Sequence, residues 1–386
     1  MKRIYFDHAA TTPVHPQVLA AMLPYFSEKF GNPSSLHSYG QEAAQAGDEA
    51  RKQLASLLNA DPREIIFTGS GTEADNFAIK GIARKLGSKK RHLITSSIEH
   101  HAVENSTKAL EKEGFTTTYL PVDSDGMVDP ESLRRAITPE TVLVSIMHAN
   151  NEVGTIQPIQ ALAEVAHERG VLFHTDAVQT VGTIPVDVKA LGVDLLSLSA
   201  HKFYGPKGVG ALYIRRGVAL EPLVCGGGQE RGLRAGTTNV PGIVGLGMAA
   251  ELAQAEMPSR MAHSISLRER LIEGLKERLE DYILTGHRSQ RLPGSASICV
   301  DFIEGESMLL LMDQEGFACS SGSACTSGSL EPSHVLKAMG IEVRLAQGSL
   351  RSTLGRENSE EDVDRFLEVL PRVVKRLREM SPFKKK

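Results

Sequence analysis

Short apolar runs alternate with segments of helical spacing through the first 215 residues, and this alternation restricts the fold of the chain. The run at 142–147 is almost entirely apolar, which is typical of a strand that is covered on both faces. Strands that alternate with helices form a mostly parallel sheet through right-handed crossovers. The sequence therefore predicts an α/β fold with helices on both faces of the sheet. The expected strands are 64–67, 92–95, 116–120, 142–147, 171–174, 194–198 and 210–214.

The remainder of the 386-residue chain indicates a second, smaller α+β domain. A glycine-rich segment at 225–239 is predicted to be a long functional loop. Helices are expected at 240–256 and 261–280, with a boundary at Met257-Pro258-Ser259 between them. We predict a large domain at 15–258 and a small domain that combines 1–14 with 259–386. Pro371 should kink the last helix, which is expected at 360–380.

Composition excludes several classes of function. The net charge of −4 does not favour nucleic acid or an acidic membrane surface as a partner. No apolar run reaches membrane-spanning length, and the N-terminus becomes polar too early for a signal peptide. We therefore expect a cytoplasmic protein whose four cysteines are reduced thiols. These cysteines form no CxxC pair, so no resident metal site is predicted.

Polar residues follow the predicted carboxyl ends of several different strands. Because these ends share one edge of a parallel sheet, their side chains are expected to converge on one crevice. Chance placement of polar groups is the alternative. The six residues are Thr72, His100, Asn151, Asp176, Gln179 and Lys202.

Lys202 lies in a Gly- and Pro-containing loop just past a buried strand. A lysine amine has a pKa of about 10.4, and burial or nearby cations lower it enough to react at neutral pH. Such an amine can form a Schiff base with a carbonyl cofactor. A solvated loop lysine is the alternative interpretation.

The segment 68–76 combines the end of a strand, a glycine-rich turn and the start of a helix. Backbone N–H groups at the helix N-terminus, with Gly71 in the turn and a hydroxyl from Thr72, form a cradle for an anion. The segment has neither a Walker nor a dinucleotide-binding pattern. A plain Ser/Thr helix cap is the alternative.

Cys325 lies in a segment of small residues and glycines at about 320–332. Such a segment buries little surface and is predicted to be mobile, with its thiol exposed. This placement suits a nucleophile that attacks in one place and delivers in another. An incidental surface cysteine is the alternative. Cys299 and Cys319, in strand-like runs, are expected to be buried.

Several motifs along the chain match one enzyme family. They are Tyr5-Phe6-Asp7-His8-Ala9-Ala10-Thr11-Thr12, Gly31-Asn32-Pro33-Ser34-Ser35, Glu99-His100, Asn150-Asn151-Glu152, His201-Lys202 with Gly205-Pro206-Lys207-Gly208, and Ser321-Gly322-Ser323-Ala324-Cys325. With these motifs the chain resembles cysteine desulfurases of the NifS/IscS kind, which belong to the class V aminotransferase group of pyridoxal-phosphate enzymes. The resemblance covers essentially the whole length and implies PLP fold type I.

The resemblance implies a role for each residue around the cofactor. Lys202 would hold pyridoxal 5'-phosphate as a Schiff base and later carry the Cα proton of the substrate. Asp176 would pair with the pyridinium nitrogen, and Gln179 would hydrogen-bond the ring hydroxyl oxygen. His100 would stack on the ring and act as acid and base.

The resemblance also implies which residues bind the phosphate and the substrate and which residue accepts the sulfur. Gly71, Thr72, Ser199 and His201 would hold the phosphate. Thr237 would reach the phosphate of a neighbouring subunit, which implies a homodimer with shared active sites.

Asn151, beside the cofactor, and Arg351 would bind the carboxylate of L-cysteine. Cys325 would accept the sulfur and contact an iron–sulfur cluster during transfer. The acceptor would be an iron–sulfur scaffold or a sulfur-relay protein.

Two departures from the family pattern stand out. Ala200 replaces a glycine that many relatives carry before the His-Lys pair, which should be harmless. The chain stops at Lys386 and lacks the longer docking tail of some relatives, so it resembles the shorter NifS-type branch. The rival functions are a transaminase, a selenocysteine lyase, or a non-enzymatic carrier of phosphate ligands or persulfide.

Overall fold

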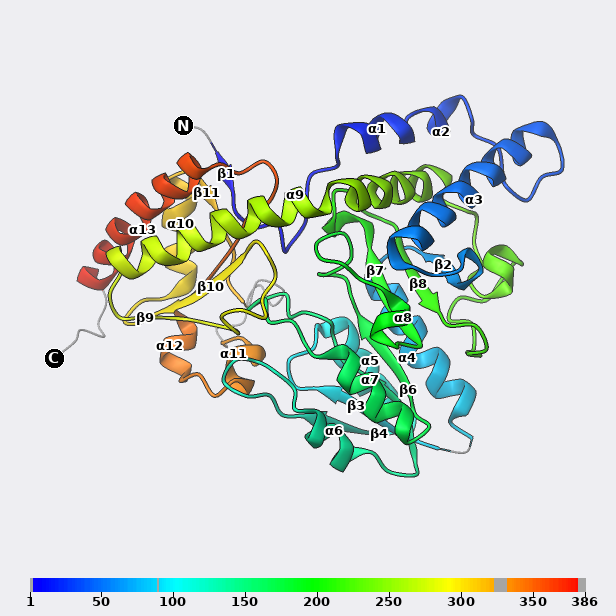
Figure 1. The fold of residues 1–386 in the computed structure, drawn as a ribbon, viewed down its shortest axis with the longest axis horizontal. Coiled ribbons are helices and arrows are strands. Elements are labelled where there is room, and N and C mark those ends of the chain that lie inside the picture. The colour runs from blue at the N-terminus through cyan, green and yellow to red at the C-terminus, as the bar shows by residue number, and fades with distance from the viewer. Residues whose placement is uncertain (1–2, 89, 323–331, 381–386) are drawn as a thin grey trace.

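A seven-stranded sheet forms the centre of the larger part of the computed structural model, which describes residues 3–88, 90–322 and 332–380 (Figure 1). The strand order is β2-β8-β7-β6-β5-β3-β4. β8 runs antiparallel to β7 and β2, and the other pairs are parallel, so the predicted mostly parallel α/β sheet is confirmed. The strands are β2 (Ile65–Thr68), β3 (His92–Ser96), β4 (Thr116–Leu120), β5 (Thr141–Ser145), β6 (Leu172–Asp176), β7 (Leu195–Ser199) and β8 (Gly210–Ile214).

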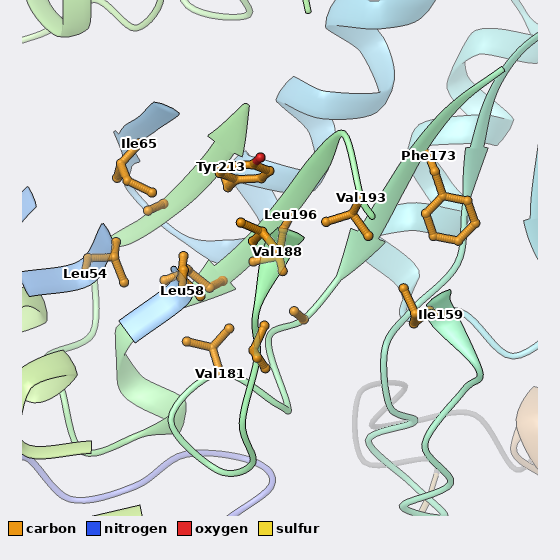
Figure 2. Close-up of a cluster of buried hydrophobic side chains, with 14 of the residues drawn as sticks. Leu54, Leu58, Ile65, Ile159, Phe173, Val181, Val188, Val193, Leu196 and Tyr213 are labelled. Atoms are coloured by element: carbon orange, nitrogen blue, oxygen red, sulfur yellow. The ribbon is translucent and has the colours of Figure 1, made fainter. Parts of the chain in front are cut away.

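Helices cover both faces of this sheet. On one face, Leu54 and Leu58 of α3 (Ser38–Leu58) and Ile159 of α7 (Ile159–Glu168) pack against Phe173 and Leu196 (Figure 2). The other face packs against α4 and α5, and the central strands are therefore apolar on both sides. The helices not yet given are α1 (Pro16–Met22), α2 (Pro24–Ser27), α4 (Gly71–Leu86), α5 (His101–Glu111), α6 (Pro130–Ala136) and α8 (Val188–Leu191).

The smaller part contains a three-stranded antiparallel sheet of order β12-β10-β9 and the two-stranded parallel pair β1–β11. Phe6, Phe317 and Phe366 form an aromatic cluster in its core, with ring centroids 5.3 to 5.8 Å apart. Pairing of β1 with β11 supports assigning the N-terminus to this part, although the domain limits stay a prediction. The elements are β1 (Ile4–Tyr5), β9 (Tyr282–Leu284), β10 (Ser295–Val300), α10 (Gly305–Gln314), β11 (Phe317–Ala318), α11 (His334–Ala338), α12 (Val343–Gln347), β12 (Ser349–Thr353) and α13 (Glu360–Met380).

One continuous helix, α9 (Val240–Arg278), replaces the two helices expected on either side of Pro258 (Figure 1). The prediction of a break was therefore wrong. Leu246 of α9 is buried in the core of the large sheet and Leu271 in that of the smaller part. Packing at both ends thus outweighs the backbone hydrogen bond that a proline cannot donate. Pro24, in contrast, does begin a new helix, because α1 ends at Met22 and α2 starts at Pro24.

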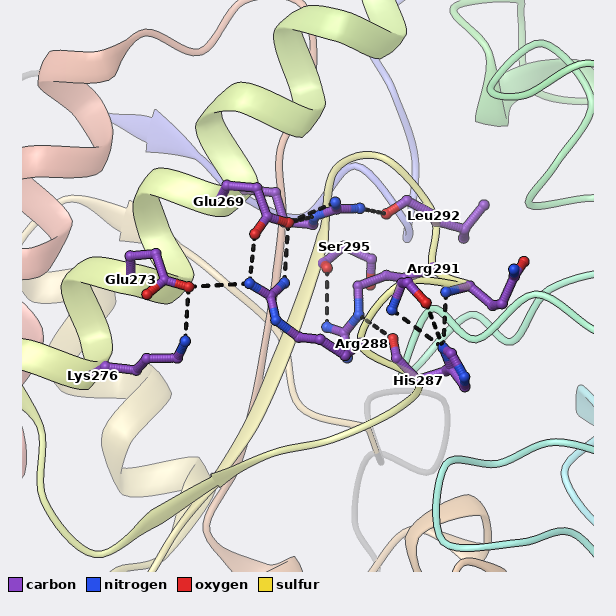
Figure 3. A network of polar contacts seen from close by, with 11 residues as sticks. Glu269, Glu273, Lys276, His287, Arg288, Arg291, Leu292 and Ser295 are labelled. Carbon is purple, nitrogen blue, oxygen red and sulfur yellow. Dashed lines mark hydrogen bonds and ion pairs between the residues drawn. The ribbon is translucent and has the colours of Figure 1, made fainter.

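A network of polar contacts holds the loop before β10 and ties it to α9 through Arg288 and Glu269 (Figure 3). Arg291 is buried, and its guanidinium donates to the carbonyl oxygens of His287, Gly286 and Ser295. Leu292 then donates its N–H to Gly154, at 2.9 Å. This loop therefore fixes the segment that follows β5, where Asn151 lies. Within the described residues, no helix has the length and apolarity needed to cross a membrane.

Candidate active site

Lys202 ends a short 3-10 helix, η2 (Ala200–Lys202), that directly follows β7. Its Nζ donates to the carbonyl oxygens of Ala9, at 2.5 Å, and Ala10, at 2.9 Å. Gln179 Nε2 donates to the same Ala9 oxygen at 3.0 Å. The N-terminal segment therefore holds Lys202 and Gln179 together. Sequence reasoning missed the carbonyls of Ala9 and Ala10, because a backbone acceptor leaves no mark on residue type.

Asp176 is the last residue of β6 and is 5% exposed. Its Oδ1 accepts the N–H of Val178 at 2.9 Å. Burial raises the pKa of Asp176 to about 6, against the opposing effects of this hydrogen bond and the Lys202 charge. Lys202 and Asp176 thus lie near enough for each to affect the charge of the other.

Two imidazoles flank Lys202, and both are neutral at pH 7. His100 caps α5, and its Nδ1 accepts the N–H of Ala102 at 3.1 Å. Burial, with a contribution from the Lys202 charge, lowers the pKa of His100 to about 4. The same two causes lower the pKa of His201 to about 4, and its Nδ1 lies 3.1 Å from Thr11 Oγ1. Neither ring adds positive charge to the site.

The N-terminus of α4 approaches the ends of β6 and β7 closely. A Cβ atom on Gly71 would lie 2.7 Å from Val178 Cγ2 and 3.3 Å from Ser199 Cβ, so only glycine allows this approach. Ser70, rather than Thr72, caps the helix by accepting the N–H of Glu73 at 3.0 Å. The side chain of Thr72 is therefore not used as the helix cap, and it is exposed. The plain Ser/Thr helix cap that was the alternative interpretation is therefore present, at Ser70, and the binding of an anion at this N-terminus stays a prediction.

The glycine-rich loop is tied to the same helix. Arg234 donates from Nε and Nη2 to the carboxylate of Glu73, at 2.8 and 3.1 Å. Thr237 follows on this loop and is exposed. Among the described residues, the Thr237 side chain makes no hydrogen bond to Lys202, Asp176 or Gln179, so its role toward a neighbouring subunit stays a prediction.

Arg351 and Asn151 come together as expected. Arg351, on β12, is 5% exposed, and its Nη1 donates to the backbone oxygen of Asn151 at 2.9 Å. Its Nη2 forms an ion pair with Asp7 Oδ1 at 2.8 Å. Nε is buried without a hydrogen-bond partner in the described part of the chain. No pattern in the sequence marks Asp7 as the counter-ion of Arg351.

Two buried glutamates from the family motifs complete the site. Glu99 accepts hydrogen bonds from Ser96 Oγ, at 2.5 Å, and from the N–H of Met147, at 3.0 Å. Burial raises its pKa to about 8. Glu152 accepts from Ser333 Oγ at 2.5 Å, and burial raises its pKa to about 7. The motifs contained both residues, but no polar pattern in the sequence singled them out.

Cys325 lies outside the described residues, so its placement stays a prediction. Cys299 is buried in β10, as expected, and burial raises its pKa to about 12. Cys319 is half-buried rather than fully buried as expected, although burial of its thiol raises its pKa to about 12, and Cys225 is exposed on the glycine-rich loop. Neither Cys299 nor Cys319 is therefore a reactive thiolate at pH 7.

The residues at this edge fit pyridoxal 5'-phosphate, the cofactor implied by the resemblance. An amine suits its aldehyde, a buried carboxylate suits its protonated ring nitrogen, and neutral imidazoles suit stacking. The N-terminus of a 16-residue helix, with Gly71 permitting close approach, suits its phosphate.

Comparisons with known proteins identify the family of the chain. The profile of the family described as "Aminotransferase class-V" matches residues 4–366. The chain is 54% identical to the cysteine desulfurase IscS of Dictyoglomus turgidum, over 100% of this chain and 98% of that protein.

Two solved structures are also similar. A NifS-like protein superposes with a TM-score of 0.92 at 43% identity, over 97% of this chain and 100% of the other. The structure titled "SspA in complex with cysteine" superposes with a TM-score of 0.80 at 40% identity, over 91% and 98%. The fold is that of the fold type I PLP enzymes, and the chain belongs to the class V aminotransferase family, among the cysteine desulfurases of the NifS/IscS kind.

Proposed function

We infer that this chain is a PLP-dependent cysteine desulfurase. It converts L-cysteine to L-alanine and passes the sulfur on, as an enzyme persulfide, to iron–sulfur cluster assembly or another sulfur-transfer pathway. The observation that carries this function is the position of Lys202 at the end of β7, beside Asp176, Gln179 and the neutral His100. The titled complex of the relative SspA supports L-cysteine as the substrate.

When bound, pyridoxal phosphate acts as an electron sink that makes the Cα–H of an amino acid acidic. Lys202 Nζ holds the cofactor and then accepts the Cα proton of the substrate. The carboxylate of Asp176 binds the protonated ring nitrogen, and Gln179 binds the ring hydroxyl oxygen. The carbonyls of Ala9 and Ala10, which now accept from Lys202 Nζ, offer that amine a second position when it is not bound to the cofactor.

His100 is placed to donate a proton. Because its Nδ1 accepts a backbone N–H, the proton of the neutral ring is on Nε2. Its low pKa means that a protonated His100 would release its proton readily at pH 7. We assign His100 the acid and base steps at the substrate, in addition to stacking on the ring.

The ends of the substrate and cofactor are held by charge and hydrogen bonds. The N-terminus of α4 at Gly71, with Thr72, Ser199 and His201, binds the phosphate. Arg351 and Asn151 bind the substrate carboxylate. Nε of Arg351, which has no hydrogen-bond partner among the described residues, provides a donor that Asp7 does not use.

Cys325 is the proposed sulfur acceptor. Its thiolate attacks the substrate sulfur, so a new S–S bond forms while the Cβ–S bond of the substrate breaks. The electron pair of that bond stays with the carbon fragment, which gains protons and leaves as L-alanine. L-cysteine and one enzyme thiol thus give L-alanine and one enzyme persulfide.

The chain is also proposed to act as a homodimer in which Thr237 completes the phosphate site of the partner subunit. Large apolar side chains along α1, α2 and the start of α3 are exposed in the single chain, which is unusual for a monomer. The glycine-rich loop that carries Thr237 is anchored by Glu230, which forms a two-bond ion pair with Arg51. The exposed apolar residues are Leu19, Leu23, Phe26, Phe30, Leu36 and Tyr39.

One assay tests the reaction. The purified protein is incubated with L-cysteine and dithiothreitol, and alanine and sulfide are measured together. The proposal predicts equal amounts of the two products, and predicts that Cys325→Ala stops sulfide release but keeps the yellow cofactor. Cys225→Ala is the matched control and should retain activity.

Other products would identify the rivals. Pyruvate instead of alanine would indicate a transaminase. Activity with selenocysteine that survives Cys325→Ala, without sulfide from L-cysteine, would indicate a selenocysteine lyase. A colourless protein without a Schiff base would favour a carrier. The acceptor protein and the cytoplasmic location stay predictions.

A further inference from the structure

A second carboxyl group is buried behind Asp176, and the proposed reaction does not use it. Asp75 lies on α4, one turn after Gly71, and is 1% exposed. Its Oδ1 has no hydrogen-bond partner in the part of the chain that the structure describes. A buried carboxylate oxygen without a partner carries a large desolvation cost, so the charge state of Asp75 needs an explanation.

Asp75 ends a chain of polar groups that crosses the sheet beneath the cofactor site. Ser145 Oγ lies 2.8 Å from His174 Nδ1, and His174 Nε2 lies 2.9 Å from Ser197 Oγ. His174 Nε2 is also 3.8 Å from Asp75 Oδ1, and the Ser197 side chain hydrogen-bonds Asp75. The chain of groups therefore runs from Ser145 through His174 and Ser197 to Asp75.

This series of hydrogen-bonded groups lies next to Asp176. His174 precedes Asp176 by two residues on β6, so both side chains point to the same face of the sheet. Ser197 is the residue of β7 that pairs with Asp176 in the strand register. A change in the position or charge of Asp75 would therefore alter the surroundings of Asp176 through Ser197 and His174.

The groups that face Asp75 do not compensate a negative charge there. Burial has the largest effect and the negative charge of Asp176 adds to it, so the pKa of Asp75 is raised well above its ordinary value, against the opposing effect of the Ser197 hydrogen bond. His174 is not a counter-ion, since burial lowers its pKa to about 3 and keeps it neutral. The Lys202 charge acts on Asp176.

The hydrogen-bond directions then follow from the proton on Asp75. With a protonated Asp75, the acid can donate to Ser197, Ser197 to His174 Nε2, and His174 Nδ1–H to Ser145. With an ionised Asp75, every donor along the chain would point the other way. The charge state of Asp75 therefore decides which nitrogen of His174 carries the proton.

We propose that Asp75 is protonated and is a positioning residue, which through Ser197 and His174 keeps the negative charge of this buried pair on Asp176. This role rests on the proposed binding of the cofactor ring by Asp176. The proton on Asp75 itself does not depend on the desulfurase reaction. As a positioning residue, Asp75 acts through Asp176, and we assign it no contact with substrate or cofactor.

Infrared difference spectra of the purified holoprotein at pH 7 test the proton. Asp75→Asn should remove a carbonyl band of a protonated carboxylic acid. The matched control, Asp129→Asn, removes an acid whose pKa is lowered by hydrogen bonds at a helix N-terminus, and should remove only carboxylate bands. Loss of carboxylate bands in Asp75→Asn would overturn the proposal.

A second variant keeps the test decisive if Asp75→Asn does not fold. Ser197→Ala retains Asp75 but removes its hydrogen bond, so the same carbonyl band should move to higher frequency. An unmoved set of protonated-acid bands would contradict the proposal. Nitrogen-15 NMR should also find the His174 proton on Nδ1 in the parent protein, and a proton on Nε2 would contradict it. None of these spectra depends on turnover, so a failed alanine assay would leave the result interpretable.

Discussion

The groups around Lys202 and the groups around Arg351 are built in different ways. Lys202, Asp176 and His100 each follow or end a strand of one sheet, so their meeting follows from sheet topology. Arg351 instead meets Asp7 and Asn151, which lie 344 and 200 residues away in the sequence. The first group can be read from local patterns, whereas the second depends on how the small and large parts of the chain join.

Replacing Lys202, in the first group, should have the largest effect on activity. Lys202→Ala removes the amine that holds the cofactor and takes the Cα proton, so sulfide release should fall by at least about a thousandfold. The cofactor absorbance that borohydride removes should be lost as well. Lys207→Ala, an exposed lysine of the same loop, is the control and should behave like the parent protein. Equal losses in both variants would point to damage of the loop.

Replacing Arg351 probes the second group. Arg351→Lys keeps the charge but cannot maintain both the Asn151 and the Asp7 contacts, so KM for L-cysteine should rise about 10- to 100-fold. The cofactor spectrum should not change, because the Arg351 side chain bonds to Asp7 and to the Asn151 backbone rather than to Lys202 or Asp176. Steady-state kinetics and absorbance measure the two effects separately. A changed spectrum with an unchanged KM would mean that Arg351 serves the cofactor instead.

Within a single chain, Thr237 belongs neither to the Lys202 group nor to the Arg351 group. Mixing two variants tests whether it serves the phosphate site of its own subunit or that of the partner subunit. Thr237→Ala should weaken cofactor binding by about tenfold, since it loses one hydrogen bond to a charged group. In a heterodimer with Lys202→Ala, one site would combine an intact Lys202 with an intact Thr237 of the partner. Mixed and re-equilibrated subunits should therefore regain activity above the sum of the separate variants. No recovery would mean that Thr237 acts within its own subunit or not at all.

The smallest effect concerns Glu99, which lies three residues after the end of β3. Its pKa is raised to about 8 in the folded protein, from 4.5. The folded state thus holds more protons than the unfolded state between these values, and stability is lost as pH rises through about 8. Glu99→Gln should flatten this dependence, by at most about 1.4 kcal/mol per pH unit. Urea unfolding of both proteins at several pH values measures it, and identical slopes would show that Glu99 is ionised.

The fold and the first group were predictable for a physical reason. Apolar runs such as 142–147 mark strands covered on both faces, and parallel strands bring their carboxyl ends to one edge. Lys202, Asp176, Gln179 and His100 could be located by this rule alone. Their chemical roles came from the family resemblance.

What the sequence did not reveal depends on contacts without a local signature. The carbonyls of Ala9 and Ala10 can belong to any residue type. The sequence contains many acidic residues, and nothing distinguishes Asp7 among them. Asp7 lies beside Arg351 only because β1 pairs with β11 in the folded chain. The continuity of α9 through Pro258 was missed because local proline preference was given more weight than packing at both ends.

That uninterrupted α9 has a mechanical consequence. At 39 residues it is about 58 Å long, and its side chains pack into the hydrophobic cores of both parts of the chain. It therefore links the two parts rigidly. Rotation of one part of the chain relative to the other would require α9 to bend. The helix bends most easily at Pro258, where the proline removes a backbone hydrogen bond. We therefore expect L-cysteine to enter and L-alanine to leave without wide domain opening, through rearrangement of individual segments at the sheet edge.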